Sequence, residues 1–347
     1  MAVSIIIPLY NKAPYICRAL SSVLRQTIQD FECIVVDDGS TDGSGDIVKG
    51  INDLRIRLVR QPNGGVSRAR NKGIELARNP LVAFLDADDE WMPGFLEASL
   101  RMHESHPYIT ACFSNYVRAS VPCPTFSQDS QGPRVVADYF AFCLSNAGLG
   151  MWTSTVTARH DVLLEIGGFP VGRTMGEDLD TWARLAWSGR IGYIPSVLAT
   201  YHFEEGACAQ SIRDAVQGKD EVFRDILETY LAWSRAGLVP PCLAESSEAY
   251  VYFMRILDIY AVLGLGRPDL ARILYSGLPR WQRYSVSALC GYLALSIPCA
   301  CRPLSGLGRR FATLLSARRW RETNSVASAR PMVANALPSG ALQGGLS

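Results

Sequence analysis

The sequence predicts an α/β protein with a mostly parallel sheet flanked by helices and with a helical C-terminal extension. Two patterns lead to this prediction. Apolar, β-branched runs at residues 3–7, 31–36 and 81–85 alternate with stretches of helical periodicity, and strands joined by helical crossovers pair in parallel. Carboxylates directly follow the second and third runs, and α/β sheets hold their ligands just beyond the carboxyl ends of strands. We therefore expect a ligand site at that edge.

Length and composition leave room for one large domain and a smaller second unit. The chain has 347 residues, of which 48% are hydrophobic, so it can form a sizeable core. The formal net charge is +1, so no global field attracts nucleic acid, and we expect no nucleic-acid partner. Any basic binding surface must be local.

The cysteines and the N-terminus favour a reduced, cytoplasmic protein. Ten cysteines are scattered through apolar runs and show no Cys-x-x-Cys spacing, which does not fit a disulfide framework. Residues 1–8 have no basic segment and no cleavage-site pattern, so they are predicted to form the first strand and not a signal peptide.

The predicted elements alternate along the chain. Residues 3–7 form a strand that Pro8 ends, and helical spacing follows from Pro14 to Leu24. Residues 31–38 form the second strand, with a turn at 39–43. The further predicted elements are a strand at 55–59, a helix after 63–65, a strand at 81–85, a surface loop at 120–133, a strand and turn at 152–159, an amphipathic helix from about 177, and a buried helix at 250–265.

The most informative acidic segment follows the third apolar run. Asp86, Asp88 and Asp89 lie so close together that their charges repel one another unless a cation lies between them. A hard divalent cation with oxygen ligands fits this pattern, and it can also hold phosphate groups. The alternative is a solvated acidic turn that caps the next helix. The chain has neither a Gly-x-Gly-x-x-Gly nor a phosphate-loop motif, so phosphate would be held by metal and by basic side chains.

Five segments in this order resemble family 2 of the nucleotide-sugar-dependent, inverting glycosyltransferases, whose Rossmann-like fold is called GT-A. They are Ile-Pro-Leu-Tyr-Asn at 7–11, Gln-Thr at 26–27, Val-Val-Asp-Asp-Gly-Ser-Thr-Asp at 35–42, the segment 63–73 and Phe-Leu-Asp-Ala-Asp-Asp at 84–89. The resemblance is close over roughly the first 110 residues and extends loosely to about residue 211.

The resemblance implies a role for several residues on the donor side. Pro8, Tyr10 and Asp38 would line the nucleoside pocket, and Arg70 and Lys72 would lie near the same nucleotide. The alternative for Asp38 is a turn or N-cap residue, a role that Ser40 and Thr41 also fit. The alternative for Arg68 and Arg70 is a solvated helix face.

The resemblance also implies a bound Mn²⁺ or Mg²⁺. Asp86 would contact the ribose and the metal, and Asp88 is the stronger candidate for a direct metal ligand. The family usually has a histidine in the loop after residue 200, where this chain has Glu204. Either His202 or Glu204 could therefore complete the metal shell, and a structural role is the alternative for His202.

On the acceptor side, the resemblance points to a turn and a helix start. Gly167, Gly168 and Phe169 match the Gly-Gly-Phe turn beside the acceptor site, although a plain tight turn also explains the glycines. Asp178 matches the general base of the family. Acids at 177–180 would also be favoured at a helix N-terminus by the helix dipole, whatever their function.

The predicted domain organisation has three parts. Residues 1–211 form the GT-A catalytic domain, with a nucleotide-sugar half at about 1–110 and an acceptor half at about 111–211. Residues 212–322 form a helical C-terminal region, and the small, polar residues 323–347 are predicted to be disordered.

The segment 284–321 predicts contact with an anionic membrane surface. Residues 284–301 carry no charge but are interrupted by Pro298, so they are too short to span a bilayer comfortably. Six arginines follow between 302 and 321 with no intervening acid, interleaved with apolar residues. The alternative is a basic helix packed on the domain. We expect a cytoplasmic protein, peripheral on the inner face of the cell membrane.

The resemblance implies transfer of a sugar from a nucleotide diphosphate, with UDP-sugar favoured, to a hydroxyl of a glycan or lipid-linked acceptor in cell-surface polysaccharide or glycolipid synthesis. A sugar-nucleotide pyrophosphorylase would carry a Gly-rich, arginine-containing loop after the first strand, which is absent. The alternative from another class is a non-catalytic, nucleotide- or glycan-binding, membrane-associated protein of the same fold.

Overall fold

A computed structural model describes residues 2–119, 121–126, 132–146, 148–173, 176–202 and 226–264 of the chain. The strands are β1 (Val3–Leu9), β2 (Phe31–Asp37), β3 (Ile56–Arg60), β4 (Leu81–Phe84), β5 (Glu90–Trp91), β6 (Ile109–Arg118), β7 (Val121–Pro124), β8 (Arg134–Val136), β9 (Val156–Arg159) and β10 (Arg190–Tyr201). The helices are α1 (Ile16–Leu24), α2 (Ser44–Lys49), α3 (Val66–Leu76), α4 (Phe95–Ser105), α5 (Tyr139–Ser145), α6 (His160–Glu165), α7 (Glu177–Ser188), α9 (Ile226–Arg235) and α10 (Ala244–Gly264), with short 3₁₀ turns η1 (Thr153–Thr155) and η2 (Pro241–Leu243).

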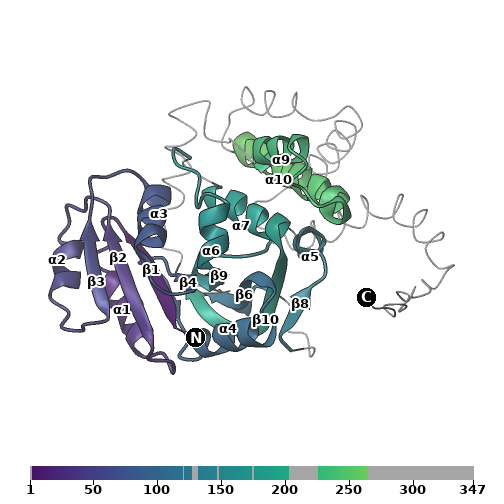
Figure 1. Cartoon of the computed structure of the whole chain (residues 1–347). Helices are drawn as coiled ribbons and strands as arrows, with labels where there is room; N and C mark the ends of the chain where they lie inside the picture. The colour runs from purple at the N-terminus through teal and green to yellow at the C-terminus, as the bar shows by residue number, and fades with distance from the viewer. Residues whose placement is uncertain are drawn as a thin grey trace, which may run out of the picture.

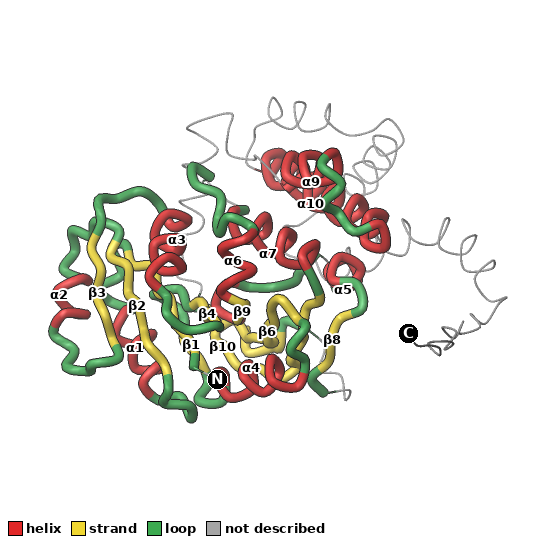
Figure 2. The backbone as a smooth tube through the Cα atoms, viewed as in Figure 1, coloured by secondary structure: helices red, strands yellow, loops and turns green. Residues whose placement is uncertain are grey.

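The described strands form one twisted sheet in the order β3-β2-β1-β4-β9-β6-β10-β5 (Figures 1 and 2). The pairs β3–β2, β2–β1, β1–β4 and β6–β10 are parallel. β9 runs antiparallel to both of its neighbours, β4 and β6. The strands β3, β2, β1 and β4 on one side of β9 therefore point the same way as β6 and β10 on the other side. The mostly parallel α/β fold predicted from the sequence is confirmed.

The strand order places a crevice at β1 and β4. From β1 the chain moves outward to β2 and β3 and then returns to the other side of β1 at β4. The loops that leave β1 and β4 therefore run in opposite directions, and α/β sheets bind ligands at such a switch point. The loop residues 10–15 and the acidic segment 85–89 both begin there.

β1 differs from its prediction because it continues through Pro8 to Leu9. Pairing between β1 and β4 ends at Ile6 with Phe84, and the Ile6 carbonyl still accepts a hydrogen bond from Leu85 N–H. Residues two apart on a strand face the same neighbour, so Pro8 faces β4 beyond the point where pairing ends. Pro8 has no backbone N–H, but the β1–β4 ladder needs no donor at this position, so it loses no hydrogen bond.

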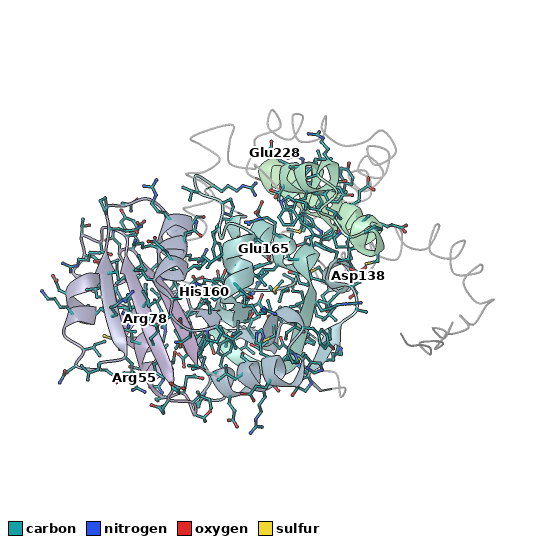
Figure 3. All side chains as sticks on the ribbon, viewed as in Figure 1. Arg55, Arg78, Asp138, His160, Glu165 and Glu228 are labelled. Carbon is teal, nitrogen blue, oxygen red and sulfur yellow. The ribbon has the colours of Figure 1, made fainter. Side chains whose placement is uncertain are left out.

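Helix α3 packs tightly on the centre of the sheet. A Cβ atom on Gly73 would lie 2.4 Å from Cγ2 of the buried Ile6, so only glycine lets the helix approach this closely. On its other side α3 meets α6, where Nε2 of His160 lies 2.8 Å from the carbonyl oxygen of Ile74 (Figure 3). This packing fixes the side chains that α3 carries toward the crevice.

Helices α9 and α10 lie side by side against α7 and α5 (Figure 1). Trp187 of α7 is buried between Phe140 of α5 and Tyr230 of α9, and its indole N–H donates to Ser247 of α10 at 3.0 Å. The predicted buried helix at 250–265 is thus part of a longer helix that starts at Ala244.

Two other predictions meet the structure only in part. The loop predicted at 120–133 contains the short strand β7, which pairs antiparallel with β6. The membrane segment 284–321, the tail 323–347 and Glu204 lie outside the described residues. Within the described residues, no helix combines the length and hydropathy needed to cross a bilayer.

Candidate active site

The site is built around Arg70, which α3 holds inside the protein. Its side chain is only 4% exposed, and its two terminal nitrogens contact Asp86 Oδ1 at 2.8 Å and Glu177 Oε1 at 2.9 Å. The guanidinium also lies over the ring of Phe169, 5.0 Å from its centroid. Burial opposes the charge on Arg70, but the two carboxylates outweigh it and raise the pKa of Arg70.

This environment changes the predicted roles of the two basic residues of α3. Arg70 is not on a solvated helix face, because its own side chain is only 4% exposed and both of its carboxylate partners are partly buried. Lys72 is partly exposed and pairs with Glu75 of the same helix at 3.0 Å. Residues two apart on a helix do not share a face, so α3 brings Arg70 to the crevice and turns Lys72 away from Arg70. The described contacts do not bring Lys72 to Asp38 or Asp86.

α3 also holds the Gly-Gly-Phe turn in place. The side-chain amide of Asn71 donates to the Phe169 carbonyl, and its oxygen accepts from Phe169 N–H, both at 2.7 Å. A Cβ on Gly168, whose φ is +64°, would lie 2.4 Å from Asn71 Oδ1. Asn71 and Arg70 therefore connect the donor-side segment 63–73 to the acceptor-side turn.

Asp178 lies in the first turn of α7, next to Glu177. It is only partly accessible, and its Oδ1 accepts a hydrogen bond from Leu179 N–H at 2.8 Å. Burial raises the pKa of Asp178 to about 7, helped by the charge of Glu177 and opposed by Arg70. A carboxyl group poised near neutral pH is suited to accept a proton.

Asp88 faces the loop that follows β1. Its Oδ2 forms an ion pair with the ammonium of Lys12, and its backbone carbonyl accepts a hydrogen bond from Arg18 of α1. The Asp88 and Lys12 side chains are 22% and 26% exposed, so the pair lies at the rim of the crevice.

Asp89 has a structural role that the sequence did not reveal. It is buried, and it accepts hydrogen bonds from the Ser154 hydroxyl, from Trp152 Nε1 at 3.3 Å and from His202 N–H at 3.2 Å. Burial and the charges of Asp86 and Asp88 raise the pKa of Asp89 to about 8, against the Ser154 hydrogen bond. Asp89, the third acid of the segment 86–89, thus links the residues just before β9 and just after β10 to the donor-side loop.

His202 lies beside this link. Its Nε2 is 3.3 Å from Glu90 Oε2, and its backbone contacts Asp89. In the part of the chain that the structure describes, no three His, Cys, Asp or Glu side chains converge as a metal cluster. Asp88 and the second oxygen of Asp86 nevertheless offer hard oxygen donors, and Lys12 already places a cation on Asp88. This chemistry fits a metal that takes one or two carboxylates and completes its shell with phosphate and water.

Asp38 holds the glycine segment that precedes α3. It is buried, and it accepts hydrogen bonds from Gln61 Nε2 at 2.7 Å, from Gly64 N–H at 3.0 Å and from Gly65 N–H at 2.8 Å. The predicted turn role belongs instead to Asp37, whose Oδ1 accepts from Ser40 N–H at 2.9 Å. Pro8 pairs with Val36 across β1 and β2, so Pro8, Asp38 and the half-exposed Tyr10 lie at adjoining strand ends.

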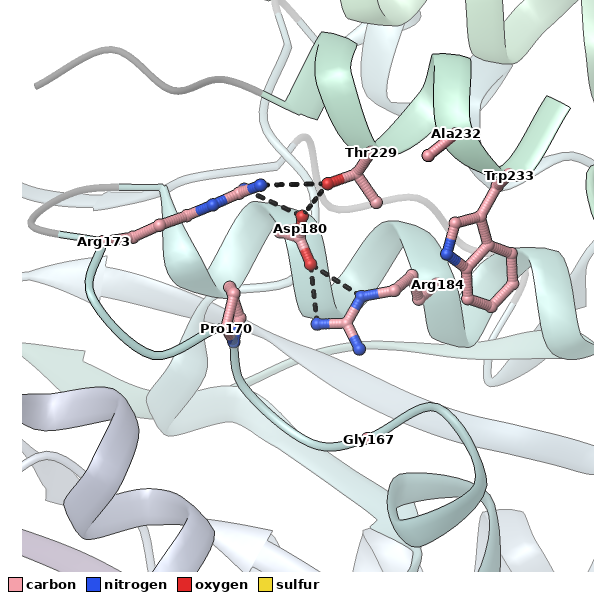
Figure 4. A pocket seen from close by; sticks show the side chains of 8 residues that line it. All are labelled: Gly167, Pro170, Arg173, Asp180, Arg184, Thr229, Ala232 and Trp233. Carbon is pink, nitrogen blue, oxygen red and sulfur yellow. Dashed lines mark hydrogen bonds and ion pairs between the residues drawn. The ribbon is translucent and has the colours of Figure 1, made fainter. Parts of the chain in front are cut away.

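A pocket of about 300 Å³ lies between the Gly167 turn, α7 and α9 (Figure 4). Asp180 is at its centre and pairs with Arg184 at 2.6 Å and with Arg173 at 2.7 Å, and it accepts a hydrogen bond from Thr229 of α9. Arg184 also donates to the Gly168 carbonyl at 2.7 Å. Because these polar groups satisfy one another, the pocket is best explained as a junction that holds α9 against α7 and the turn.

Comparison with known proteins places the segment that carries these donor-side residues in a family. Residues 4–132 match the family described as Glycosyl transferase family 2. This segment is a family 2 glycosyltransferase domain. The described donor-side residues from Pro8 to Asp89 all lie within the family 2 domain, whereas the Gly-Gly-Phe turn and α7 lie beyond the matched residues.

Relatives and solved structures extend this finding to the fold. An uncharacterized glycosyltransferase of Nostoc sp. is 34% identical over 49% of this chain and 54% of its own length, and validoxylamine A glucosyltransferase of Streptomyces hygroscopicus subsp. jinggangensis is 33% identical over 52% and 50%. The chain thus spans about half of these two relatives. A mannosyltransferase from Pyrobaculum calidifontis, solved with GDP-Man and Mn²⁺, has a TM-score of 0.57 at 20% identity and covers 91% of this chain and 85% of its own. Such a likeness shows the shared GT-A fold.

We predict that Arg70→Met lowers the free energy of unfolding by about 2–4 kcal/mol, because it leaves two partly buried carboxylates without their cation. Urea unfolding measures this change. The matched control is Arg101→Ala, which removes an exposed arginine paired with Glu97 on α4 and should change stability by less than about 0.5 kcal/mol. A loss for Arg70→Met as small as that of the control would show that Arg70 does not hold the two halves of the site together.

Proposed function

We propose that the chain is an inverting glycosyltransferase that moves a sugar from a nucleotide diphosphate to an acceptor hydroxyl. The observation that carries the proposal is the position of Arg70, which joins Asp86 of the donor-side segment to Glu177, the neighbour of Asp178. One buried cation thus joins a donor-side carboxylate to the residue next to the candidate base. The names of the glycosyltransferase relatives support the proposal, as do the nucleotide sugars bound in two solved structures that the chain resembles, UDP-GlcNAc in TarS of S. aureus and GDP-Man in the Pyrobaculum mannosyltransferase.

The donor would bind along the carboxyl edge of β1, β2 and β4. Pro8, Tyr10 and Asp38 would line the nucleoside pocket, with Tyr10 offering an exposed ring on which a base can stack. Asp88, with Asp86 beside it, would hold a Mn²⁺ or Mg²⁺ ion. That ion would supply positive charge to the departing diphosphate.

Asp178 would act as the general base. Glu177 is committed to Arg70 by an ion pair, whereas Asp178 uses one oxygen for Leu179 N–H and, among the described residues, has no ion-pair partner. Its second oxygen would accept the proton of the acceptor hydroxyl as that oxygen attacks the anomeric carbon from the face opposite the leaving diphosphate. A single displacement of this kind inverts the anomeric centre and needs no covalent intermediate.

The donor we favour is a UDP-sugar, and the acceptor a glycan or a lipid-linked glycan in cell-surface polysaccharide or glycolipid synthesis. A non-catalytic glycan- or nucleotide-binding protein is the competing function. Release of nucleoside diphosphate from a panel of nucleotide sugars with Mn²⁺ separates the two. Binding of a donor without turnover in the presence of candidate acceptors would favour the competing function.

We predict that Asp178→Asn lowers kcat by about 10²-fold or more while the Kd for UDP-sugar and Mn²⁺ is retained, because a base acts on the acceptor and not on the donor. Single-turnover transfer and calorimetry measure the two quantities. Near-parental transfer by a folded variant that binds donor would assign the base to another residue, with Glu177 or Asp180 tested next.

The same assignment gives a pH dependence for the parent enzyme. The base must be deprotonated to accept a proton, and its pKa is raised to about 7, so kcat should fall by about tenfold per pH unit below 7 and level off above it.

We predict that Asp88→Asn lowers the Mn²⁺-dependent affinity for UDP by at least about tenfold, as loss of a metal-site carboxylate should. Asp38→Asn should instead weaken UDP binding to a similar degree with and without Mn²⁺, because Asp38 is assigned to the nucleoside. Calorimetry with Mn²⁺, UDP and both together measures the difference. Unchanged Mn²⁺-dependent affinity in Asp88→Asn would contradict the metal assignment.

We also propose that residues 284–321 attach the protein to an anionic membrane surface, on the basis of the uncharged run and the six arginines that follow it. A chain that ends before Tyr284 should no longer sediment with vesicles that contain phosphatidylserine and should still hydrolyse donor. Equal sedimentation of both chains would rule out this attachment.

A further inference from the structure

We infer that the Lys12 ammonium is an exchangeable cation with two positions in the donor site. Without a divalent cation it pairs with the Asp88 carboxylate, and when a divalent cation binds that carboxylate the ammonium contacts the diphosphate of the donor. The inference rests on the proposed function, because it assumes a metal at Asp88. Its first support is the ion pair between the Lys12 ammonium and Asp88 Oδ2, which joins the loop after β1 to the acidic segment after β4.

The position of Lys12 is fixed by its neighbours in the chain. Asn11 has a φ of +51°, an unusual value for a residue with a side chain. Its side-chain oxygen accepts from Thr41 N–H at 2.8 Å, and its own N–H donates to Ser40 Oγ at 3.1 Å. On the other side, Ala13 N–H donates to Asp42 at 2.8 Å. The backbone is therefore anchored on both sides of Lys12, and only its side chain is left to move.

Two basic side chains contact different groups of Asp88. Arg18 donates to the Asp88 carbonyl and lies 3.9 Å from Glu90, so it holds the backbone of the segment. Lys12 contacts the carboxylate itself. Both cations also lie over the ring of Tyr15, Arg18 at 5.6 Å and Lys12 at 5.7 Å from its centroid.

The contrast with Arg70 shows which cation can exchange. Arg70 is buried between two carboxylates, so the charge of Asp86 is compensated whether or not a ligand is bound. Among the described residues Lys12 has one ion-pair partner, and both side chains of that pair are partly exposed to solvent. A divalent cation carries twice the charge of the ammonium, so it can displace Lys12 from the solvent-accessible Asp88 carboxylate. The flexible stem of lysine then lets the ammonium reach an anion nearby, and lysine is a common ligand of phosphate.

The test compares Mn²⁺ binding alone with UDP binding in the presence of Mn²⁺. Lys12→Met removes the charge and nearly keeps the length of the side chain. We expect Mn²⁺ alone to bind about fivefold more tightly, because its competitor at Asp88 is gone, and UDP with Mn²⁺ to bind about fivefold or more weakly, because a phosphate contact is lost. Water-proton relaxation measures the first affinity and calorimetry the second. Lys49→Met, which removes an exposed lysine of α2, should change neither.

The two affinities should move in opposite directions, which a merely structural role of Lys12 would not produce. Both affinities falling together, or neither changing, would overturn the inference. Asp88→Asn identifies the source of a failure. If Asp88→Asn leaves Mn²⁺-dependent binding intact, the metal assignment in the proposed function is wrong. If Asp88→Asn abolishes that binding and Lys12→Met does not separate the two affinities, only the role of Lys12 is wrong.

Discussion

One buried cation determines how the two halves of this protein meet. A guanidinium in the interior is stable only when carboxylates compensate it, and Arg70 takes one from the segment after β4 and one from the start of α7. Each carboxylate equally needs the cation. The strand order brings β1, β4 and β6 into one sheet, but this three-way contact sets the spacing between the donor-side acids and the candidate base.

The acids of the segment 86–89 are distinguished by what surrounds each of them. Asp86 is compensated by an interior arginine, Asp88 by a lysine at the rim, and Asp89 is buried among hydrogen-bond donors, where its pKa is raised to about 8. Three acids of one short segment thus differ in role. Asp86 stays paired with a buried cation, Asp88 pairs with the cation that we infer can exchange, and Asp89 accepts structural hydrogen bonds. Local environment, not residue type, separates these functions.

The sequence predicted what depends on local pattern. The apolar runs identified β1, β2 and β4, and the acids after them lie at the carboxyl edge of the sheet, where the sequence predicts a ligand. It did not predict the partners of Arg70, Lys12 or Asp89, because those contacts join segments far apart in the chain, which no periodicity reports. Lys72 was grouped with Arg70 because both are basic and belong to one motif, but a helix turns residues two apart toward different surroundings. The hydrogen bonds of Asp38 to Gly64 and Gly65 likewise join distant segments, which no local pattern reports.

The junction at Asp180 shows how the helices α9 and α10 are joined to the rest of the described chain. Sequence character changes near residue 212, yet Thr229 of α9 completes the bonding of a buried acid in α7, and aromatic rings of α7, α5 and α10 interlock around Trp187. The helices α9 and α10 therefore pack as one unit with α7 and α5. A different C-terminal region could replace α9 and α10 without loss of these contacts only if it supplied both a hydroxyl for Asp180 and an apolar surface for Trp187.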